Sequence, residues 1–352
     1  MQGVELIKRL CACFGPTSLE CEVADAVREE LSALNITPIE DRMGNLLYHL
    51  EGPQGAPRVM LAAHMDEVGF MVTEIEEEGF IRFDNVGGID RRVLCGRQIT
   101  LSDGTRRVPG VIAAKGIHMQ DAEERKKTPT SDELYIDIGA DSREEAERLV
   151  SPGDLGVFDT ECRTFGKNGA YLCGKALDDR AGCALLIEIL RAVADERLPL
   201  DLWFAFTVRE EIGKSGAGVA ANRIAPDFAV ILETTAIGDR PDSAAHKRVA
   251  AVGEGGVLSL LDRGTIYDRA MVERALAVAA EQNIPVQIKK YVSGGNDAAR
   301  IQRSGSGVRC MALSAPTRYL HAPVSVMAVR DYEAMRALVC AMLKNWKVEP
   351  NV

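Results

Sequence analysis

The 352-residue sequence is poor in aromatic side chains and has no concentrated positive charge. Aromatic residues make up 5% of the chain, and only two of them are tryptophan. Lysine and arginine total 42 against 52 aspartate and glutamate, which gives a formal net charge of -10. A protein that binds nucleic acid needs a basic face to contact phosphates. We therefore expect no nucleic-acid partner.

Signals for secretion and for membrane insertion are also missing. No apolar run approaches the roughly 18 residues of a membrane-spanning helix, and the N-terminal MQGVEL has no basic region followed by an apolar run. The nine cysteines are scattered, without the Cys-x-x-Cys spacing of zinc fingers or thioredoxin-like sites. Reduced thiols are typical of the cytosol. We therefore expect a cytoplasmic protein with no membrane contact.

The order of predicted elements indicates two domains of different character. Helices and apolar strands alternate up to residue 67 and again from residue 164, whereas short alternating strands and many turns fill the stretch between them. The predicted fold class is α/β, with a mixed-sheet α/β/α domain formed by residues 1–67 and 164–352. Residues 68–163 are expected to form an inserted, barrel-like β-rich domain.

Two local patterns in the α/β part predict specific backbone features. The run TSLE at residues 17–20 matches a capping box, with Thr17 as N-cap of a helix that reaches about Leu34. Farther on, the apolar strand DLWFAF at 201–206 leads to Glu210 and Glu211. On a continuing strand these two glutamates would point to opposite faces, so a shared site requires a turn.

Side chains that bind metals follow several of the predicted strands or begin a helix. Because ligands gather at the carboxyl ends of strands in open α/β sheets, we expect these side chains to meet at one edge. Two imidazoles with several carboxylates suit Zn²⁺, Co²⁺ or Mn²⁺, and the excess of carboxylates suits two ions that share a bridging carboxylate. The candidates are His64 with Asp66, Asp178 with Asp179, Glu210 with Glu211, Glu233, and His321.

Each candidate alone also has an ordinary structural interpretation. His64 could be a structural residue, Glu233 a plain acid at a strand end, and one of Asp178 and Asp179 could cap the helix that follows. Five such places in this order favour a metal site. The other histidines lack acidic partners at strand ends, and we predict no functional role for His49, His118 and His246.

Four motifs together make the chain resemble the tetrahedral aminopeptidases, a family of dinuclear metallopeptidases that includes glutamyl and leucyl aminopeptidases. Some relatives in this family are labelled endoglucanase. The resemblance extends over essentially the whole chain. The motifs are AHMDEVG (63–69), GKALDDR (174–180), REEIG (209–213) and RYLHAP (318–323).

The resemblance implies a role for each candidate residue. His64 and Glu233 are similar to ligands of the first metal, and Asp66 to the residue that orients the His64 ring. Asp178 resembles the bridging carboxylate. Glu211 and His321 resemble ligands of the second metal, and Glu210 the general base. The implied cofactors are two divalent ions per subunit, with Zn²⁺ expected and Co²⁺ as the alternative.

The resemblance also implies substrates and assembly, and the chain departs from the family pattern at two places. Short peptides are the implied substrates, residues 68–163 resemble a dimerisation domain, and such dimers build a homo-dodecamer with an internal chamber. Glu233 stands where the family most often has the shorter aspartate. The loop at 115–118 lacks the Pro-Pro-His run of many members.

Three other functions remain open at this stage. A dinuclear deacylase of N-acyl amino acids could use the same ligands, and a glycosidase could use the glutamate pair, although few aromatic residues are available to stack on sugars. A non-catalytic metal-binding scaffold is the third. Candidate loops for the pocket that selects the first residue are 253–256, 293–297 and 315–318, where Arg318 could favour acidic substrates.

Overall fold

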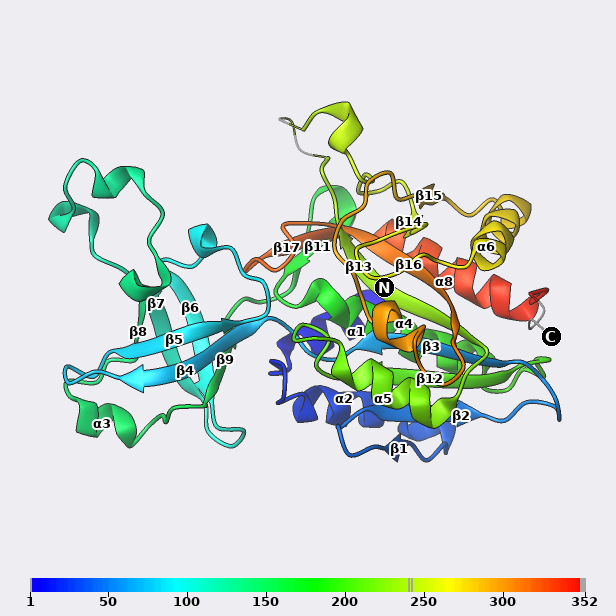
Figure 1. Ribbon diagram of the computed structural model, residues 1–352, viewed down its shortest axis with the longest axis horizontal. Helices are drawn as coiled ribbons and strands as arrows, with labels where there is room; N and C mark the ends of the chain where they lie inside the picture. The colour runs from blue at the N-terminus through cyan, green and yellow to red at the C-terminus, as the bar shows by residue number, and fades with distance from the viewer. Residues whose placement is uncertain (1, 240, 242, 349–352) are drawn as a thin grey trace.

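The computed structural model describes residues 2–239, 241 and 243–348, and it places a closed β-barrel beside a larger α/β body (Figure 1). The helices are α1 (Gln2–Ala12), α2 (Cys21–Leu31), α3 (Arg143–Glu147), α4 (Leu177–Val193), α5 (Ser215–Ile224), α6 (Arg269–Gln282), α7 (Ala298–Ile301) and α8 (Val329–Lys344). None of the helices in this described part is both long enough and apolar enough to cross a bilayer.

The α/β body is built on a mixed sheet. Its main path runs β1-β2-β12-β3-β13-β16-β17-β11-β10, and β14 and β15 pair beside β16. These strands are β1 (Ile39–Glu40), β2 (Leu46–Leu50), β3 (Arg58–His64), β10 (Arg163–Phe165), β11 (Tyr171–Gly174), β12 (Asp201–Thr207), β13 (Phe228–Ala236), β14 (Gly256–Leu258), β15 (Val286–Ile288), β16 (Arg309–Arg318) and β17 (Ser325–Ala328). The central strands β12, β3, β13 and β16 are mutually parallel.

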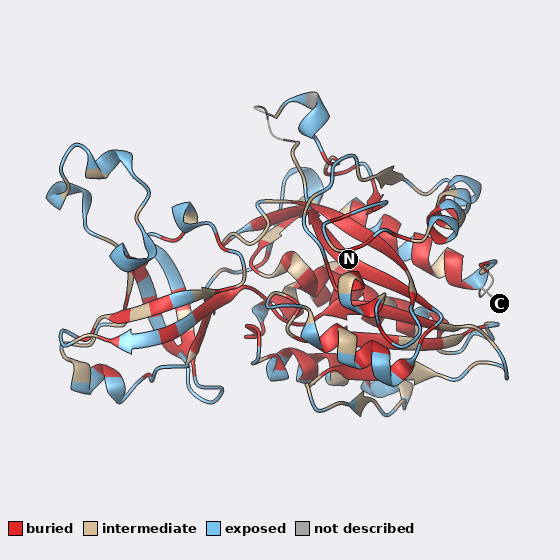
Figure 2. Ribbon diagram, viewed as in Figure 1, coloured by how far each residue is buried: buried red, intermediate tan, exposed pale blue. Residues whose placement is uncertain are grey.

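Burial explains why these central strands read as apolar runs in the sequence. In β3 every residue after Arg58 is buried, and β13 is buried along all but its last residue (Figure 2). Helix α4 packs against β3 and β13 and contacts α1, α2 and α8, while α5 contacts β12 and α7. Strands covered in this way need apolar side chains on both faces.

The barrel has its own hydrophobic core. Its strands pair antiparallel in the order β4-β5-β8-β7-β6-β9, and β9 closes on β4. They are β4 (Gly69–Ile75), β5 (Ile81–Val86), β6 (Arg97–Ser102), β7 (Val108–Ala113), β8 (Tyr135–Asp137) and β9 (Leu155–Phe158). All six fall within residues 68–163. The predicted fold class, a mixed-sheet α/β domain with an inserted barrel-like domain, is confirmed.

The start of α2 differs from the predicted capping box. The helix begins at Cys21 with Glu20 at its N-cap, and no side chain caps it. The Thr17 hydroxyl instead donates to the Asp66 carboxylate at 2.6 Å. The capping-box prediction was wrong because Thr17 is engaged by a residue 49 positions away.

Candidate metal centre

Parallel register brings the ends of three strands to one edge of the sheet. His64 ends β3 and pairs with Thr207, the last residue of β12, while Glu233 lies near the end of β13. Asp178 lies where α4 begins, before its helical geometry is regular, and His321 lies in the loop between β16 and β17. The predicted meeting of these side chains at the carboxyl ends of the strands is therefore observed.

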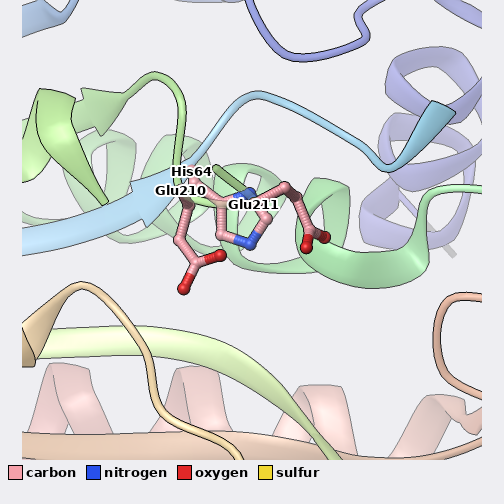
Figure 3. A group of neighbouring side chains, drawn as sticks. All are labelled: His64, Glu210 and Glu211. Carbon is pink, nitrogen blue, oxygen red and sulfur yellow. The ribbon is translucent and has the colours of Figure 1, made fainter. Parts of the chain in front are cut away.

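The turn that the two glutamates require is present. Strand β12 ends at Thr207, and Arg209 has a positive φ of 58°, which bends the chain before Glu210. The Asp66 carboxylate accepts both following backbone N–H groups, from Glu210 at 2.9 Å and from Glu211 at 3.1 Å. Figure 3 shows both glutamate side chains beside the His64 imidazole. Asp66 thus fixes the backbone that carries the pair.

Asp66 also lies against the His64 ring. The ring nitrogen Nδ1 is 3.0 Å from the Asp66 carbonyl oxygen and 3.3 Å from its carboxylate. An N–H at Nδ1 satisfies these acceptors and leaves Nε2 with a lone pair for a metal. Burial alone would raise the pKa of Asp66, but hydrogen bonds from His64 and Thr17 lower it below its ordinary value.

The two oxygens of Asp178 face two different histidines. His64 Nε2 is 3.2 Å from Asp178 Oδ1, and His321 Nε2 is 3.2 Å from Asp178 Oδ2. Each histidine has one further carboxylate nearby. Glu233 is 3.5 Å from His64 Nε2, and Glu211 is 3.4 Å from His321 Nε2. The arrangement is two matched donor sets with one shared carboxylate.

The donor atoms converge closely enough to hold cations. Donor atoms within 4.8 Å of one another are found in the group of His64, Asp178 and Glu233 and in the group of Asp178, Glu211 and His321. His64 forms a third such group with Glu210 and Glu211. The structure therefore brings together all five predicted ligands and the predicted base.

The pKa values in this cluster are shifted because its carboxylates are buried and close together. Burial, followed by repulsion from Asp178, raises the pKa of Glu211 to about 8. Burial and the charges of Asp179 and Asp178 raise the pKa of Glu233 well above its ordinary value. Burial lowers the pKa of His321, but Asp178 and Glu211 raise it to about 9. Carboxylates held this close in a buried site fit a group that brings positive charge.

Glu210 has a different set of neighbours from Glu211. Its carboxylate lies 2.9 Å from Lys214 Nζ, one turn farther along the chain. Burial raises the pKa of Glu210, opposed by the charges of His64 and Lys214. A raised pKa makes this carboxylate a stronger proton acceptor than an ordinary exposed glutamate.

A cavity of about 500 Å³ opens over the whole cluster. Its wall includes the five ligand candidates and Glu210, and also residues 293–296, which belong to a predicted pocket loop. The other two predicted loops, 253–256 and 315–318, are not among its lining residues. Arg318 pairs with Asp239 at 2.6 Å instead. Arg318 therefore lies outside the cavity lining, and its pairing with Asp239 favours a structural role for it.

The structure also shows what the residues around the cluster do. Glu67, inside the His64 motif, forms a buried ion-pair network with Lys175 at 2.7 Å and Arg180 at 3.0 Å, and this network was not predicted from the sequence. Asp179 accepts the Gly182 N–H at 2.9 Å, so one member of the aspartate pair caps α4 as expected. His49 pairs with Asp201 at 2.7 Å and stacks on Trp203, as a structural residue would.

Two histidines and several carboxylates that converge on one shared aspartate under an open cavity fit a metal-dependent hydrolase. The family model described as M42 glutamyl aminopeptidase matches residues 44–338. The chain therefore belongs to this family, which also contains the tetrahedral (TET) peptidases, and it is an aminopeptidase.

Solved and curated relatives agree with this assignment along the whole chain. A TET aminopeptidase from a marine sediment archaeon (Thaumarchaeota archaeon SCGC AB-539-E09) is 34% identical, with a TM-score of 0.94 over 99% of this chain and 98% of that one. The TET1 peptidase of Pyrococcus horikoshii, described as assembling into a tetrahedron or a large octahedral shell, is 34% identical with a TM-score of 0.87 over 97% and 99%. A lysyl aminopeptidase of Pyrococcus furiosus is 29% identical over 97% of both chains.

Proposed function

We propose that the protein releases the N-terminal residue of short peptides with the help of two divalent metal ions, Zn²⁺ or alternatively Co²⁺. His64, Asp178 and Glu233 would hold one ion, and Asp178, Glu211 and His321 the other. The observation that supports this most directly is the division of Asp178, whose two oxygens each lie 3.2 Å from a different histidine.

The bound ions would polarise the scissile carbonyl and lower the pKa of the attacking water. The remaining work falls to side chains of this chain. Glu210 takes a proton from that water and delivers it to the leaving amine. Asp66 orients the His64 ring and, through its bonds to the backbone N–H groups of residues 210 and 211, keeps the base beside the ligands. The extra methylene of Glu233 still lets its carboxylate approach His64 to 3.5 Å.

We also propose that residues 68–163 are a dimerisation domain and that dimers assemble into a dodecamer in the cytoplasm. A solved relative that is 33% identical over 97% of this chain, with a TM-score of 0.86, is described as a dodecamer. All nine cysteines are free, which fits a reducing compartment.

An Asp178→Asn variant tests the shared ligand. An amide oxygen binds divalent cations more weakly than a carboxylate oxygen does, so we expect the loss of both ions rather than one. Metal content is measured by elemental analysis of the purified protein, beside Glu233→Gln as the matched change at a ligand of one ion only. Loss of a single equivalent in both variants would contradict a shared role for Asp178.

A further inference from the structure

Helix α7 and the residue before it hold both ends of the turn that carries the two glutamates, residues 208–212. Asp297, the N-cap residue of α7, accepts a hydrogen bond from the Thr207 hydroxyl at 2.6 Å. Three residues later, Arg300 Nε donates to the Gly213 carbonyl oxygen at 3.0 Å. Thr207 directly precedes the turn and Gly213 directly follows it. The start of α7 therefore bridges the glutamate turn from one end to the other.

The side chain of Asp297 does not cap its own helix. An aspartate at an N-cap usually accepts from the first backbone N–H groups of the helix, but Asp297 makes no such bond. Its Oδ1 is buried without a hydrogen-bond partner in the part of the chain that the structure describes, which leaves Thr207 as the one group there that the side chain bonds. This side chain is only 1% exposed. Its single bond joins α7 to β12 and does not stabilise the start of α7.

Thr207 lies where two strands of the metal centre are joined. It is fully buried, ends β12 and pairs in parallel register with His64 at the end of β3. Its carbonyl oxygen accepts the Met65 N–H at 2.7 Å, and its hydroxyl also lies 3.2 Å from the Ala63 carbonyl oxygen. A displacement of Thr207 would therefore be passed along the chain to Glu210, three residues farther on.

The segment before α7 forms part of the wall of the cavity. Residues 293–296 line it, and the side chain of Asn296 accepts the Ala298 N–H at 3.0 Å. Asp297 follows directly, so one short stretch both faces the cavity and bonds the strand that leads to the base. Burial, followed by the charge of Glu210, raises the pKa of Asp297 to about 7. Asp297 therefore lies close enough to the base to interact with its charge.

We infer that Asp297 is a positioning residue for the general base, because its bond to Thr207, together with the bond of Arg300 on the far side of the turn, holds Glu210 in place relative to the cavity wall. Neither Asp297 nor Arg300 lines the cavity. Both therefore act through the backbone of residues 208–212 and not by contact with a substrate. This inference rests on the proposed aminopeptidase function.

Two substitutions of Asp297 separate this role from a general effect on folding. Asp297→Ala removes the bond to Thr207, and we expect kcat on alanyl-p-nitroanilide to fall about 10- to 100-fold, the effect of misplacing a reacting group by about 1 Å. KM and the content of both ions should be unchanged, because bound ions hold their own ligands in place but not the base. Asp297→Asn keeps the size of the side chain and its hydrogen bond, so kcat should return to within about threefold of the unmodified protein.

Thr207→Val removes the other partner of the same bond and should lower kcat alone. Because both changes act through one bond, the double variant with Asp297→Ala should be no slower than the slower single variant. Thr317→Val is the matched control, since Thr317 is also fully buried and its hydroxyl donates to the Ala315 carbonyl of its own strand at 3.1 Å. Its kcat should equal that of the unmodified protein.

Full kcat in Asp297→Ala, equal losses in the alanine and asparagine variants, or losses that multiply in the double variant would overturn the positioning role while the peptidase stands. Loss of ions along with kcat would also overturn it. If Asp297→Ala does not fold, Thr207→Val and Arg300→Met, which changes an exposed side chain, still test the inference, and full kcat in both would overturn it. Absence of turnover by the unmodified protein on every aminoacyl substrate would overturn the proposed function, and this inference with it.

Discussion

At the scale of single residues, two adjacent glutamates have been given different surroundings by one turn. Glu211 faces His321 and repels Asp178, whereas Glu210 pairs with Lys214. The turn depends on Asp66, which is fully buried and accepts from the backbone of both. The backbone turn therefore places two side chains of the same type beside different charged neighbours.

The pKa values of two ligand residues also predict how metal uptake depends on pH. In the metal-free protein, Glu211 with a pKa of about 8 and His321 with a pKa of about 9 both hold protons at pH 7. Metal binding requires the deprotonated forms. Binding should therefore release protons at pH 7, and affinity should rise with pH until about 9. Calorimetric titration of the metal-free protein in buffers of different ionisation enthalpy measures this release, and uptake without proton release would contradict it.

At the scale of elements, helix α5 packs against the segment that leads into the turn before Glu210. A Cβ on Gly216 would lie 2.2 Å from the Val208 carbonyl oxygen and 2.6 Å from Asn45 Oδ1. The Asn45 side chain bonds both Val208 N and the Gly216 carbonyl, so β2, β12 and α5 meet at one point. A side chain at Gly216 would push directly on the segment that leads to Glu210.

Gly216→Ala should therefore destabilise the protein by about 1–3 kcal/mol, the usual cost of overpacking a close-packed site. Gly218→Ala on the same helix is the matched control, because its Cβ would meet only Arg300 Cβ at an ordinary 3.6 Å. That control should gain about 0.5–1 kcal/mol from helix propensity. Chemical denaturation compares the two, and equal stabilities would contradict this account of the turn.

The parts of the fold and site that sequence could predict are those with local signatures. Apolar runs ended by His64, Glu211 and Glu233 marked the edge of the sheet, because buried parallel strands must be apolar throughout. What the sequence could not show are pairings between distant residues. Thr17 bonds Asp66, so its predicted capping role was wrong. Arg318 pairs with Asp239, 79 positions away, and does not line the cavity over the metal centre.

At the scale of the whole molecule, the barrel and the α/β body are joined by a specific contact. The Arg107 guanidinium lies 3.9 Å from the centre of the Phe14 ring and pairs with Glu22 at 2.5 Å. The barrel also exposes apolar side chains on its strands, including Met71 at 41% and Val111 at 40%. In the proposed assembly through the barrel, another copy of the chain would cover these positions.

Assembly through the barrel predicts the effect of a charge at these positions. If the protein forms the proposed dodecamer, Met71→Asp and Val111→Asp should shift it to smaller species, because a desolvated carboxylate without a partner is costly at an interface. Val219→Asp changes a similarly exposed apolar residue on α5 of the body and is the comparison. Analytical ultracentrifugation reports the masses. An unchanged mass in both barrel variants would contradict a dimerisation role for these strands.

The central claim, that Glu210 moves the proton while its neighbours hold the metals, is tested most directly by Glu210→Gln. The amide keeps the size of the side chain but accepts no proton, so we expect unchanged content of the two ions and a kcat about 100- to 10,000-fold lower. Elemental analysis and steady-state turnover on one preparation give both numbers. Full turnover with both ions bound, or loss of an ion along with activity, would contradict the assignment of Glu210 as the base.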